Sequence, residues 1–445
     1  MIIIELLIFL STLLPIIHII NAVFTSRKFR DRTAIGKKKM SIIIPCFNEE
    51  DTVLGSINGL LNIDYDDIEA IYVNDGSTDK TFCVLNRMLN LAPVYRNHPH
   101  QHNVRTIYQS KTHPNFYVID KANGGKSEAL NAGIFFASCD IVVTLDADSV
   151  LKKDALLYMN AAFEDADVVA AGGAIHIMQG YDALYLGNKL GFKKRFLITL
   201  QILEYLKGFY IYKLSLSKQK ALAIISGAFG VFRKEIILKA GGFRKTVGED
   251  IDITIHIQQL IHKTKQKILY LPHALCYTQC PENWRDLKKQ RIRWQKGFID
   301  CVSHYKRFLL KTFLVRSLSF HFLLEALVIG ICSCVFTIFT YVFVAVLAFC
   351  DSQIVWVFFQ YYLFCLGFNI VYSVSAIVLC IKYNWYPKGT MMKAGGAILF
   401  DIFFYRYFNL FMYIAGTFLY FWSGRKMQNW NKVDRNKRAF LAPNQ

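Results

Sequence analysis

The sequence predicts an α/β domain bounded by membrane-embedded helices, and three observations support this prediction. Apolar residues make up 53% of the 445 residues, and they are concentrated towards the two ends of the chain. Between the ends, short β-branched runs alternate with helical patterns, which is typical of a sheet covered by helices. Several of these runs end in aspartate or glycine turns, and open α/β sheets bind ligands at the carboxyl ends of their strands.

The first apolar run, Ile2 to Phe24, is long enough to cross a bilayer, and its one charged residue is Glu5. Basic residues follow the run instead of preceding it, and no small-residue cleavage site is present, so a secretory signal is not expected. The positive-inside rule places the start of the chain outside the cell and the following residues in the cytoplasm. We therefore expect residues 1–26 to be a membrane anchor.

The C-terminal third contains three further apolar segments, over about 317–349, 354–381 and 394–422. The charges between them favour a crossing, an external turn and a return to the cytoplasm. The last segment has basic flanks and two internal charges, Asp401 and Arg406, which are costly in lipid unless they are paired. The sequence leaves open whether it is a third span or a re-entrant or interfacial helix.

These patterns predict four parts of the chain. The divisions are an anchor (1–26), a cytosolic domain (27–316), membrane helices (317–424) and a basic tail (425–445) whose side of the membrane is left open. The net charge of +19 lies largely beside the apolar segments, so anionic lipid headgroups explain it better than nucleic acid does. The eleven cysteines follow no metal or disulfide spacing, which predicts reduced thiols.

The central motif is Thr144-Leu145-Asp146-Ala147-Asp148-Ser149, directly after the apolar run 140–143. That run is typical of a buried parallel strand. Two carboxylates with one residue between them, at the end of such a strand, offer hard oxygen ligands, which suit Mg²⁺ or Mn²⁺. Alone, the pattern is more often a solvated turn, so its meaning depends on the motifs around it.

Polar turns also end the other predicted strands. Strands over 40–44 and 68–73 each end in a short turn that opens a helix. The residues of interest in these two turns are Pro45, Asn48, Glu49 and Asp75. Taken alone, Asp75 is better explained as an aspartate near a helix N-terminus. The stretch 91–115, with four histidines and no matching carboxylate or cysteine set, is interpreted as an irregular solvated loop.

Two glycine-containing loops would let a ligand approach the backbone closely. In Asn123-Gly124-Gly125-Lys126, the lysine begins a predicted helix and could reach a phosphate or a base, although the spacing is not that of a P-loop. The second loop, residues 225–230, contains Gly227 and Phe229. An acidic motif, Gly248-Glu249-Asp250, follows it.

The last motif before the membrane segments is Gln290-Arg291-Ile292-Arg293-Trp294, on a helix predicted from Asn283 onward. The spacing places Gln290, Arg293 and Trp294 on one helical face. Hydrogen-bond donors beside a large aromatic ring suit a diphosphate next to a sugar. The alternative is a membrane-facing helix with snorkelling arginines and an interfacial tryptophan. An amphipathic helix at the membrane face is also expected over 197–213.

In this order, the motifs resemble those of the processive family 2 inverting glycosyltransferases, which include cellulose, chitin, hyaluronan and poly-N-acetylglucosamine synthases. The resemblance rests on Asp75, Asp146-x-Asp148, Glu249-Asp250 and Gln290-x-x-Arg293-Trp294, and it covers about residues 38–300. It implies a GT-A type, Rossmann-like domain that binds a UDP-sugar with Mg²⁺ or Mn²⁺. One departure is Gly248, where the family usually has threonine.

The resemblance also implies a role for each motif. Asp250 would be the general base, oriented or tuned by Glu249. Asp148 would coordinate the metal, with Asp146 supporting the metal or contacting the nucleotide. The implied donor-binding residues are Pro45, Asn48, Glu49, Asp75, Lys126, Asp146, Gln290 and Arg293, and the implied acceptor-binding residues are Trp294, Gly227 and Phe229.

The expected function is that of a multi-pass plasma-membrane β-glycosyltransferase with a cytoplasmic catalytic domain. It would transfer a sugar, with N-acetylglucosamine as the best guess, from a UDP-sugar to a growing polysaccharide and export the chain. The alternative is a non-processive enzyme that makes a glycolipid on a lipid acceptor. A membrane scaffold with an inactive domain is disfavoured by the intact carboxylates. Expected partners are the donor, the acceptor, membrane lipids and a small membrane subunit or a second copy, without nucleic acid.

Overall fold

The computed structural model describes residues 2–26, 36–95, 101–181, 191–324, 352–383 and 386–422. The chain divides into two compact units, each formed from separate stretches of sequence. The unit that we call the sheet unit contains residues 30–198 and 222–286. The unit that we call the helical unit contains residues 1–29, 199–221 and 287–425.

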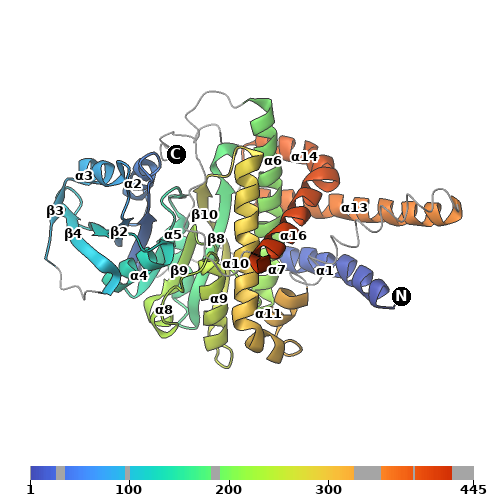
Figure 1. Cartoon of the computed structure of the whole chain (residues 1–445), viewed down its shortest axis with the longest axis horizontal. Helices are drawn as coiled ribbons and strands as arrows, with labels where there is room; N and C mark the ends of the chain where they lie inside the picture. The colour runs from blue at the N-terminus through green and yellow to red at the C-terminus, as the bar shows by residue number, and fades with distance from the viewer. Residues whose placement is uncertain are drawn as a thin grey trace. The chain divides into compact units, whose positions relative to one another are not determined.

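One mixed ten-stranded sheet forms the core of the sheet unit (Figure 1), in the order β3-β4-β5-β2-β1-β6-β9-β8-β10-β7. The strands are β1 (Met40–Cys46), β2 (Ile68–Asp75), β3 (Leu91–Pro93), β4 (Val104–Ser110), β5 (Phe116–Lys121), β6 (Ile141–Leu145), β7 (Val150–Leu151), β8 (Val168–Ile177), β9 (Phe229–Arg233) and β10 (Lys267–Thr278). Every residue of β1, β2 and β6 is buried, as expected for parallel strands covered on both faces. The strands predicted over 40–44, 68–73 and 140–143 are therefore confirmed.

The register of the central strands brings the predicted turn motifs to one edge of the sheet. Ile42 of β1 lies opposite Ala70 of β2 and Val143 of β6, and both pairings are parallel. The carboxyl ends of these three strands therefore share an edge. Strand β9 is antiparallel to β6, with Phe229 opposite Leu145, so the loop before β9 reaches the same edge.

Short helices connect the strands of the sheet unit. They are α2 (Val53–Leu61), α3 (Thr81–Leu89), η1 (Gln101–Asn103), α4 (Lys126–Phe136), α5 (Ala155–Phe163), η2 (Met178–Gly180), α8 (Lys234–Lys239) and α9 (Glu249–Leu260). Helix α4 packs closely on β1, because a Cβ at Gly133 would lie only 2.2 Å from Cγ2 of Ile43. This close packing fixes the helix whose first residue is Lys126.

The segment 91–115 corrects one prediction, because it contains strands β3 and β4 instead of an irregular loop throughout. Strand β4 pairs antiparallel with both β3 and β5. Three of its seven residues, Val104, Ile107 and Tyr108, are apolar or aromatic, and of these only Ile107 is buried. Pairing with β5 thus supplies the stabilisation that the apolar pattern does not reveal. Two of the four histidines, at 98 and 100, lie outside the described residues.

The helical unit contains long apolar helices. Its elements are α1 (Ile2–Ser26), α6 (Phe192–Lys207), η3 (Gly208–Tyr212), α7 (Lys213–Lys218), α10 (Trp284–Lys311), α11 (Ser317–Phe320), α13 (Ser352–Tyr383), α14 (Lys388–Gly396), α15 (Ile398–Phe400), η5 (Asp401–Tyr405) and α16 (Arg406–Trp422), with α6 and α10 beginning in residues of the sheet unit. Within the described ranges, two segments are long and apolar enough to cross a membrane, Leu366–Tyr383 and Ile398–Trp422. The described apolar part of α1, Leu13–Thr25, is shorter, so the N-terminal anchor stays a prediction. Most of the predicted span 317–349 lies outside the described residues.

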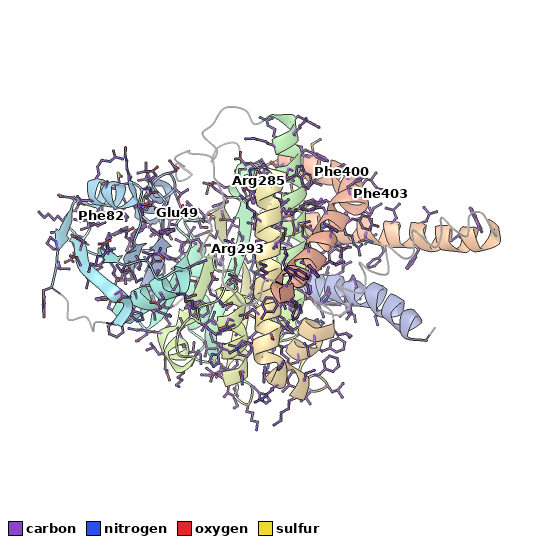
Figure 2. All side chains as sticks on the ribbon, viewed as in Figure 1. Glu49, Phe82, Arg285, Arg293, Phe400 and Phe403 are labelled. Atoms are coloured by element: carbon purple, nitrogen blue, oxygen red, sulfur yellow. The ribbon has the colours of Figure 1, made fainter. Side chains whose placement is uncertain are left out.

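Both charged residues inside Ile398–Trp422 have polar partners. Lys207 Nζ donates to Asp401 Oδ2 at 2.6 Å, and Arg406 Nη1 donates to Asn369 Oδ1 at 2.9 Å. These partners lower the cost of placing the two charged side chains in lipid, and Asp401 has an oppositely charged partner. Figure 2 shows Phe400 and Phe403 on the same segment, which also exposes large apolar side chains. These are Leu399, Phe404, Phe411, Phe418, Phe421 and Trp422.

Candidate active site

A lysine joins two of the predicted acidic motifs at the carboxyl edge of the sheet. Lys126 Nζ lies 2.8 Å from Asp146 Oδ1 and 3.0 Å from Glu249 Oε1. Asp146 follows β6, whereas Glu249 begins α9, so the ion pairs connect distant parts of the sequence. All three side chains keep partial exposure, with 31% of the Asp146 side chain accessible. A small polar ligand could therefore reach the cluster.

Lys126 is a fixed positive charge in this cluster. Burial alone would lower its pKa, but the carboxylates of Asp146 and Glu249 raise the pKa well above its usual value. Gly125, the residue before the helix, has a φ of +93°, a conformation that side-chain-bearing residues rarely adopt. The glycine therefore allows the turn that brings the lysine to the first position of α4, where the helix dipole adds positive potential.

Asp250 lies next to Glu249 in the first turn of α9. Its Oδ2 accepts a hydrogen bond from the Gly227 N–H at 3.3 Å, and its Oδ1 accepts one from the Ile251 N–H at 2.9 Å. Burial and then the charge of Glu249 raise the pKa of Asp250 to about 6, although Lys126 and the two N–H donors lower it. A carboxyl group with a pKa near the working pH is suited to general base catalysis.

The loop before β9 approaches this cluster through its backbone. A Cβ at Gly227 would lie 3.0 Å from Lys126 Nζ, so a side chain there would crowd the lysine. Thr254 of α9 holds the loop, because its hydroxyl accepts from the Ile225 N–H at 3.0 Å and donates to the Asp250 carbonyl at 2.6 Å. The close approach predicted for this loop is present, while a contact with an acceptor stays a prediction.

Asp148 is buried beside the cluster and is supported by Ser149. The Ser149 hydroxyl donates to Asp148 Oδ1 at 3.1 Å and lies 3.0 Å from Thr278 Oγ1. After burial, the charges of Asp148 and Asp146 raise the pKa of the Cys276 thiol, so both carboxylates lie near it. Both carboxylates therefore act on the thiol of one residue of β10.

The carboxylate pair fits a divalent cation that takes its remaining ligands from substrate and water. Across the described ranges, no group of three or more His, Cys, Asp or Glu side chains is arranged to hold a metal ion by itself. Mg²⁺ commonly binds through one or two carboxylates together with substrate phosphates. Asp146 and Asp148 match that number of hard oxygen ligands, and metal binding by these two residues stays a prediction.

Asp75 lies deeper than the other carboxylates and is surrounded by donors. Lys121 Nζ donates to its Oδ1 at 2.6 Å, and both side chains are fully buried. The N–H groups of Gly124 and Gly125 donate to the same carboxylate at 3.0 and 2.8 Å. Asp75 thus shapes the turn that precedes Lys126, and a contact with uridine stays a prediction. No local sequence pattern indicates that Lys121 pairs with Asp75, because the two residues are brought together by the pairing of β2 with β5.

The turn after β1 is tied to the turn after β2. Asn48 has a φ of +56°, and its Oδ1 accepts from the Thr78 N–H at 2.8 Å. Glu49, labelled in Figure 2, donates its N–H to Thr81 Oγ1 at 2.7 Å. Pro45 is a buried residue of β1. These contacts order the two turns, and donor binding by Pro45, Asn48 and Glu49 stays a prediction.

Phe229 has a packing role in the core of the sheet unit. Its side chain is fully buried, and its ring fills the space beside Gly173, where a Cβ would lie 2.4 Å from Cδ1 of the ring. In this conformation the ring has no accessible surface, so its burial argues against a direct contact between the Phe229 side chain and an acceptor.

The Gln-Arg-x-Arg-Trp box lies on α10 in the helical unit, and the predicted helix is confirmed. Gln290 and Arg293 are half-buried, and Trp294 is exposed; Arg293 is labelled in Figure 2. Arg291 was given no role from the sequence, yet it is buried and makes several of the polar contacts of this region.

Comparisons with known proteins agree with this arrangement. The sequence matches the models "Glycosyl transferase family 2" over residues 41–240 and "Glycosyl transferase family group 2" over residues 141–374. Poly-beta-1,6-N-acetyl-D-glucosamine synthase from Staphylococcus epidermidis is 32% identical over 262 residues, covering 58% of this chain and 54% of that protein. The synthase of that name from Staphylococcus aureus strain MSSA476 is 30% identical over 261 residues, with the same coverage. This chain thus spans about half the length of the curated relatives that it matches.

A solved structure shares the fold. A mannosyltransferase from Pyrobaculum calidifontis, solved in complex with GDP-Man and Mn²⁺, aligns with a TM-score of 0.56 and 17% sequence identity. The alignment covers 89% of this chain and 99% of the mannosyltransferase. The mixed sheet with its acidic carboxyl edge is that of a GT-A-like glycosyltransferase, and this chain is a member of the family 2 group of glycosyltransferases.

Proposed function

We propose that this protein is a membrane-embedded inverting β-glycosyltransferase that extends a polysaccharide from a UDP-sugar, with N-acetylglucosamine as the sugar. The observation that supports the chemistry most is the cluster of Lys126, Asp146, Glu249 and Asp250 at one sheet edge. The similarity to poly-N-acetylglucosamine synthases favours this sugar and a polymeric product.

Asp250 acts as the general base in this proposal. Its pKa of about 6 leaves it ionised at neutral pH and still basic enough to take a proton from an acceptor hydroxyl. The N–H of Gly227 orients one carboxylate oxygen, and Glu249 sustains the raised pKa. The hydroxyl oxygen attacks the anomeric carbon opposite the diphosphate, the bond to the diphosphate breaks, and the sugar is inverted to a β-linkage.

Different residues hold the uridine part and the diphosphate part of the donor. Asp75, with the backbone around Pro45 to Glu49, holds the uridine, and Lys126 meets a phosphate or the base. Asp146 and Asp148 would hold Mg²⁺ or Mn²⁺, and the bound metal would supply positive charge that stabilises the leaving diphosphate. The remaining donor contacts come from Gln290 and Arg293, and the acceptor contacts from Trp294 and Gly227.

The membrane part of the proposal follows from the helical unit. We infer that Leu366–Tyr383 and Ile398–Trp422 cross the plasma membrane, with the sheet unit in the cytoplasm. The polar partners of Asp401 and Arg406, together with the exposed apolar side chains of both segments, support this inference. Chain export through these helices, with lipids and a second subunit or second copy as partners, completes the proposed function.

The test is sugar transfer by purified full-length protein in detergent. Radiolabelled UDP-N-acetylglucosamine and UDP-glucose are supplied separately with Mg²⁺ or Mn²⁺, and products are separated by gel and by thin-layer chromatography. High-molecular-weight label from UDP-N-acetylglucosamine is the expected result. Label confined to a small lipid-soluble product would replace the polymer with a glycolipid. Polymer from UDP-glucose alone would overturn the proposed sugar, and label from neither donor would overturn the proposed function.

A further inference from the structure

Arg291, the second residue of the Gln-Arg-x-Arg-Trp box, lies at the centre of a buried polar cluster in the helical unit. Its side chain is only 2% exposed, and Nη2 lies 2.6 Å from Glu204 Oε2 of α6. The Tyr405 hydroxyl of η5 donates to the same glutamate oxygen at 2.7 Å and lies 3.3 Å from Nη2. We call Glu204, Arg291 and Tyr405 the arginine cluster.

The other side of the guanidinium contacts the box itself. Nη1 of Arg291 donates to Gln290 Oε1 at 2.8 Å. The guanidinium carbon also lies 4.3 Å from the ring centroid of Trp294, within the range of a cation–π contact. The planar fork of arginine can make these contacts together with the Glu204 pair, whereas a lysine ammonium cannot.

Stability alone does not explain this ion pair, in which Arg291 is buried and the Glu204 side chain is 27% exposed. A buried ion pair can often be replaced by apolar side chains of similar volume with little loss, so its presence is weak evidence for a stabilising role. The contacts to Gln290 and Trp294 give a second reason for an arginine at this position.

We propose that Arg291 is a positioning residue for the box. It sets the orientation of the Gln290 amide and holds the indole of Trp294 in place. Because Oε1 of Gln290 accepts from Arg291, the amide nitrogen is directed to donate elsewhere, which suits a negatively charged leaving group. The proposal rests on the proposed function in two respects. The leaving group is taken to be a nucleoside diphosphate, and Trp294 is taken to contact a sugar.

Helix α10, which carries the box, also contacts the candidate membrane segment Ile398–Trp422. Figure 1 shows α6, α10 and α16 beside one another. Arg291 Nε lies 3.4 Å from Asn409 Oδ1, and the Gln295 amide donates to Thr417 Oγ1 at 2.9 Å. A Cβ at Gly416 would lie 2.7 Å from Cβ of Gln295, so the two helices approach closely. The arginine cluster therefore positions the box relative to Ile398–Trp422.

The test compares Arg291→Lys, Arg291→Met and Tyr405→Phe with Arg307→Lys, a control at an exposed arginine of the same helix. For Arg291→Lys we expect kcat to fall about 10- to 100-fold with a much smaller change in the donor KM, since a misplaced donor group weakens the transition state most. We expect a larger fall in kcat for Arg291→Met and a fall of only a few-fold for Tyr405→Phe. The control Arg307→Lys should retain wild-type kcat and KM. Size-exclusion chromatography identifies any variant that fails to fold.

A second readout does not depend on the reaction. The emission of Trp294, obtained as the difference between each protein and its Trp294→Phe counterpart, should change in Arg291→Lys and stay unchanged in Arg307→Lys. If the wild-type protein transfers no sugar while this emission difference is present, the proposed function fails and the positioning role stands. Wild-type kcat in Arg291→Lys, or unchanged Trp294 emission, would overturn the positioning role, even if the variant unfolds at a lower temperature.

Discussion

The two units of this protein use an ion-paired lysine and an ion-paired arginine in different ways. Lys126 in the sheet unit pairs with Asp146 and Glu249, all with accessible surface, so a ligand can compete for each charge. Arg291 in the helical unit is almost completely buried, and its partners are protein groups, Glu204 and Gln290 among them. The comparison teaches that the exposure of the cation itself, and not the presence of an ion pair, distinguishes the lysine that we propose to bind a ligand from the arginine that we propose to position its neighbours.

The largest expected effect lies in the sheet unit, at the proposed base. Asp250→Asn removes the proton acceptor and keeps a similar shape, so kcat should fall about 10²- to 10⁴-fold, measured as sugar transfer. Asp64→Asn, at an exposed aspartate away from the sheet edge motifs, serves as the matched control and should retain wild-type activity. A variant Asp250→Asn with activity within a few-fold of wild type would contradict the assignment.

Removal of the divalent metal should come next in size. Chelation with EDTA should strongly reduce transfer, and added Mn²⁺ or Mg²⁺ should restore it. Asp148→Asn should raise the metal concentration needed for half-maximal activity by about 10-fold or more, and Ser149→Ala, which removes a support of Asp148, by less. Full activity in EDTA, after exhaustive dialysis, would remove the metal from the mechanism.

In the helical unit, substitution of an ion pair should change stability more than chemistry. Lys207→Met leaves Asp401, which is 5% exposed, without its lysine partner and should destabilise the unit by about 1–3 kcal/mol. Thermal unfolding in detergent measures this effect, and the double variant Lys207→Met/Asp401→Leu should recover most of it. A double variant as unstable as the single one would show that the pair itself is not responsible.

The smallest effect, and the sharpest test of the Lys126 cluster, is a pair of opposite pH shifts. Because the pKa of Asp250 is about 6, kcat/KM should rise with pH through that value as the carboxyl group loses its proton. Glu249→Gln removes a charge that raises this pKa, so the acidic limb should move to lower pH, by on the order of one unit. Lys126→Met removes a charge that lowers it, so the limb should move to higher pH. Shifts in the same direction would show that the two charges do not act on Asp250 as described.

The local sequence predicted the central strands and the polar turns that end them. The apolar run before Asp146, and the runs before Pro45 and Asp75, are buried parallel strands as expected. Strand β4 was missed because only one of its apolar side chains is buried and its stabilisation comes from pairing with β3 and β5. The helix of the Gln290 box was predicted from its spacing, but the burial of Arg291 depends on α6 and η5, which lie far away in the sequence.

The sequence by itself determined which residues could do chemistry here: carboxylates at strand ends, glycines before a lysine, and a donor-rich helix beside a tryptophan. Apolar periodicity and turn residues encode these features locally. Only the tertiary structure decided that Lys126 joins Asp146 to Glu249, that Lys121 pairs with Asp75, and that Arg291 supports Gln290. These choices depend on strand register and helix packing, in which residues distant in the chain compete for the same partners and burial decides which charges must be paired.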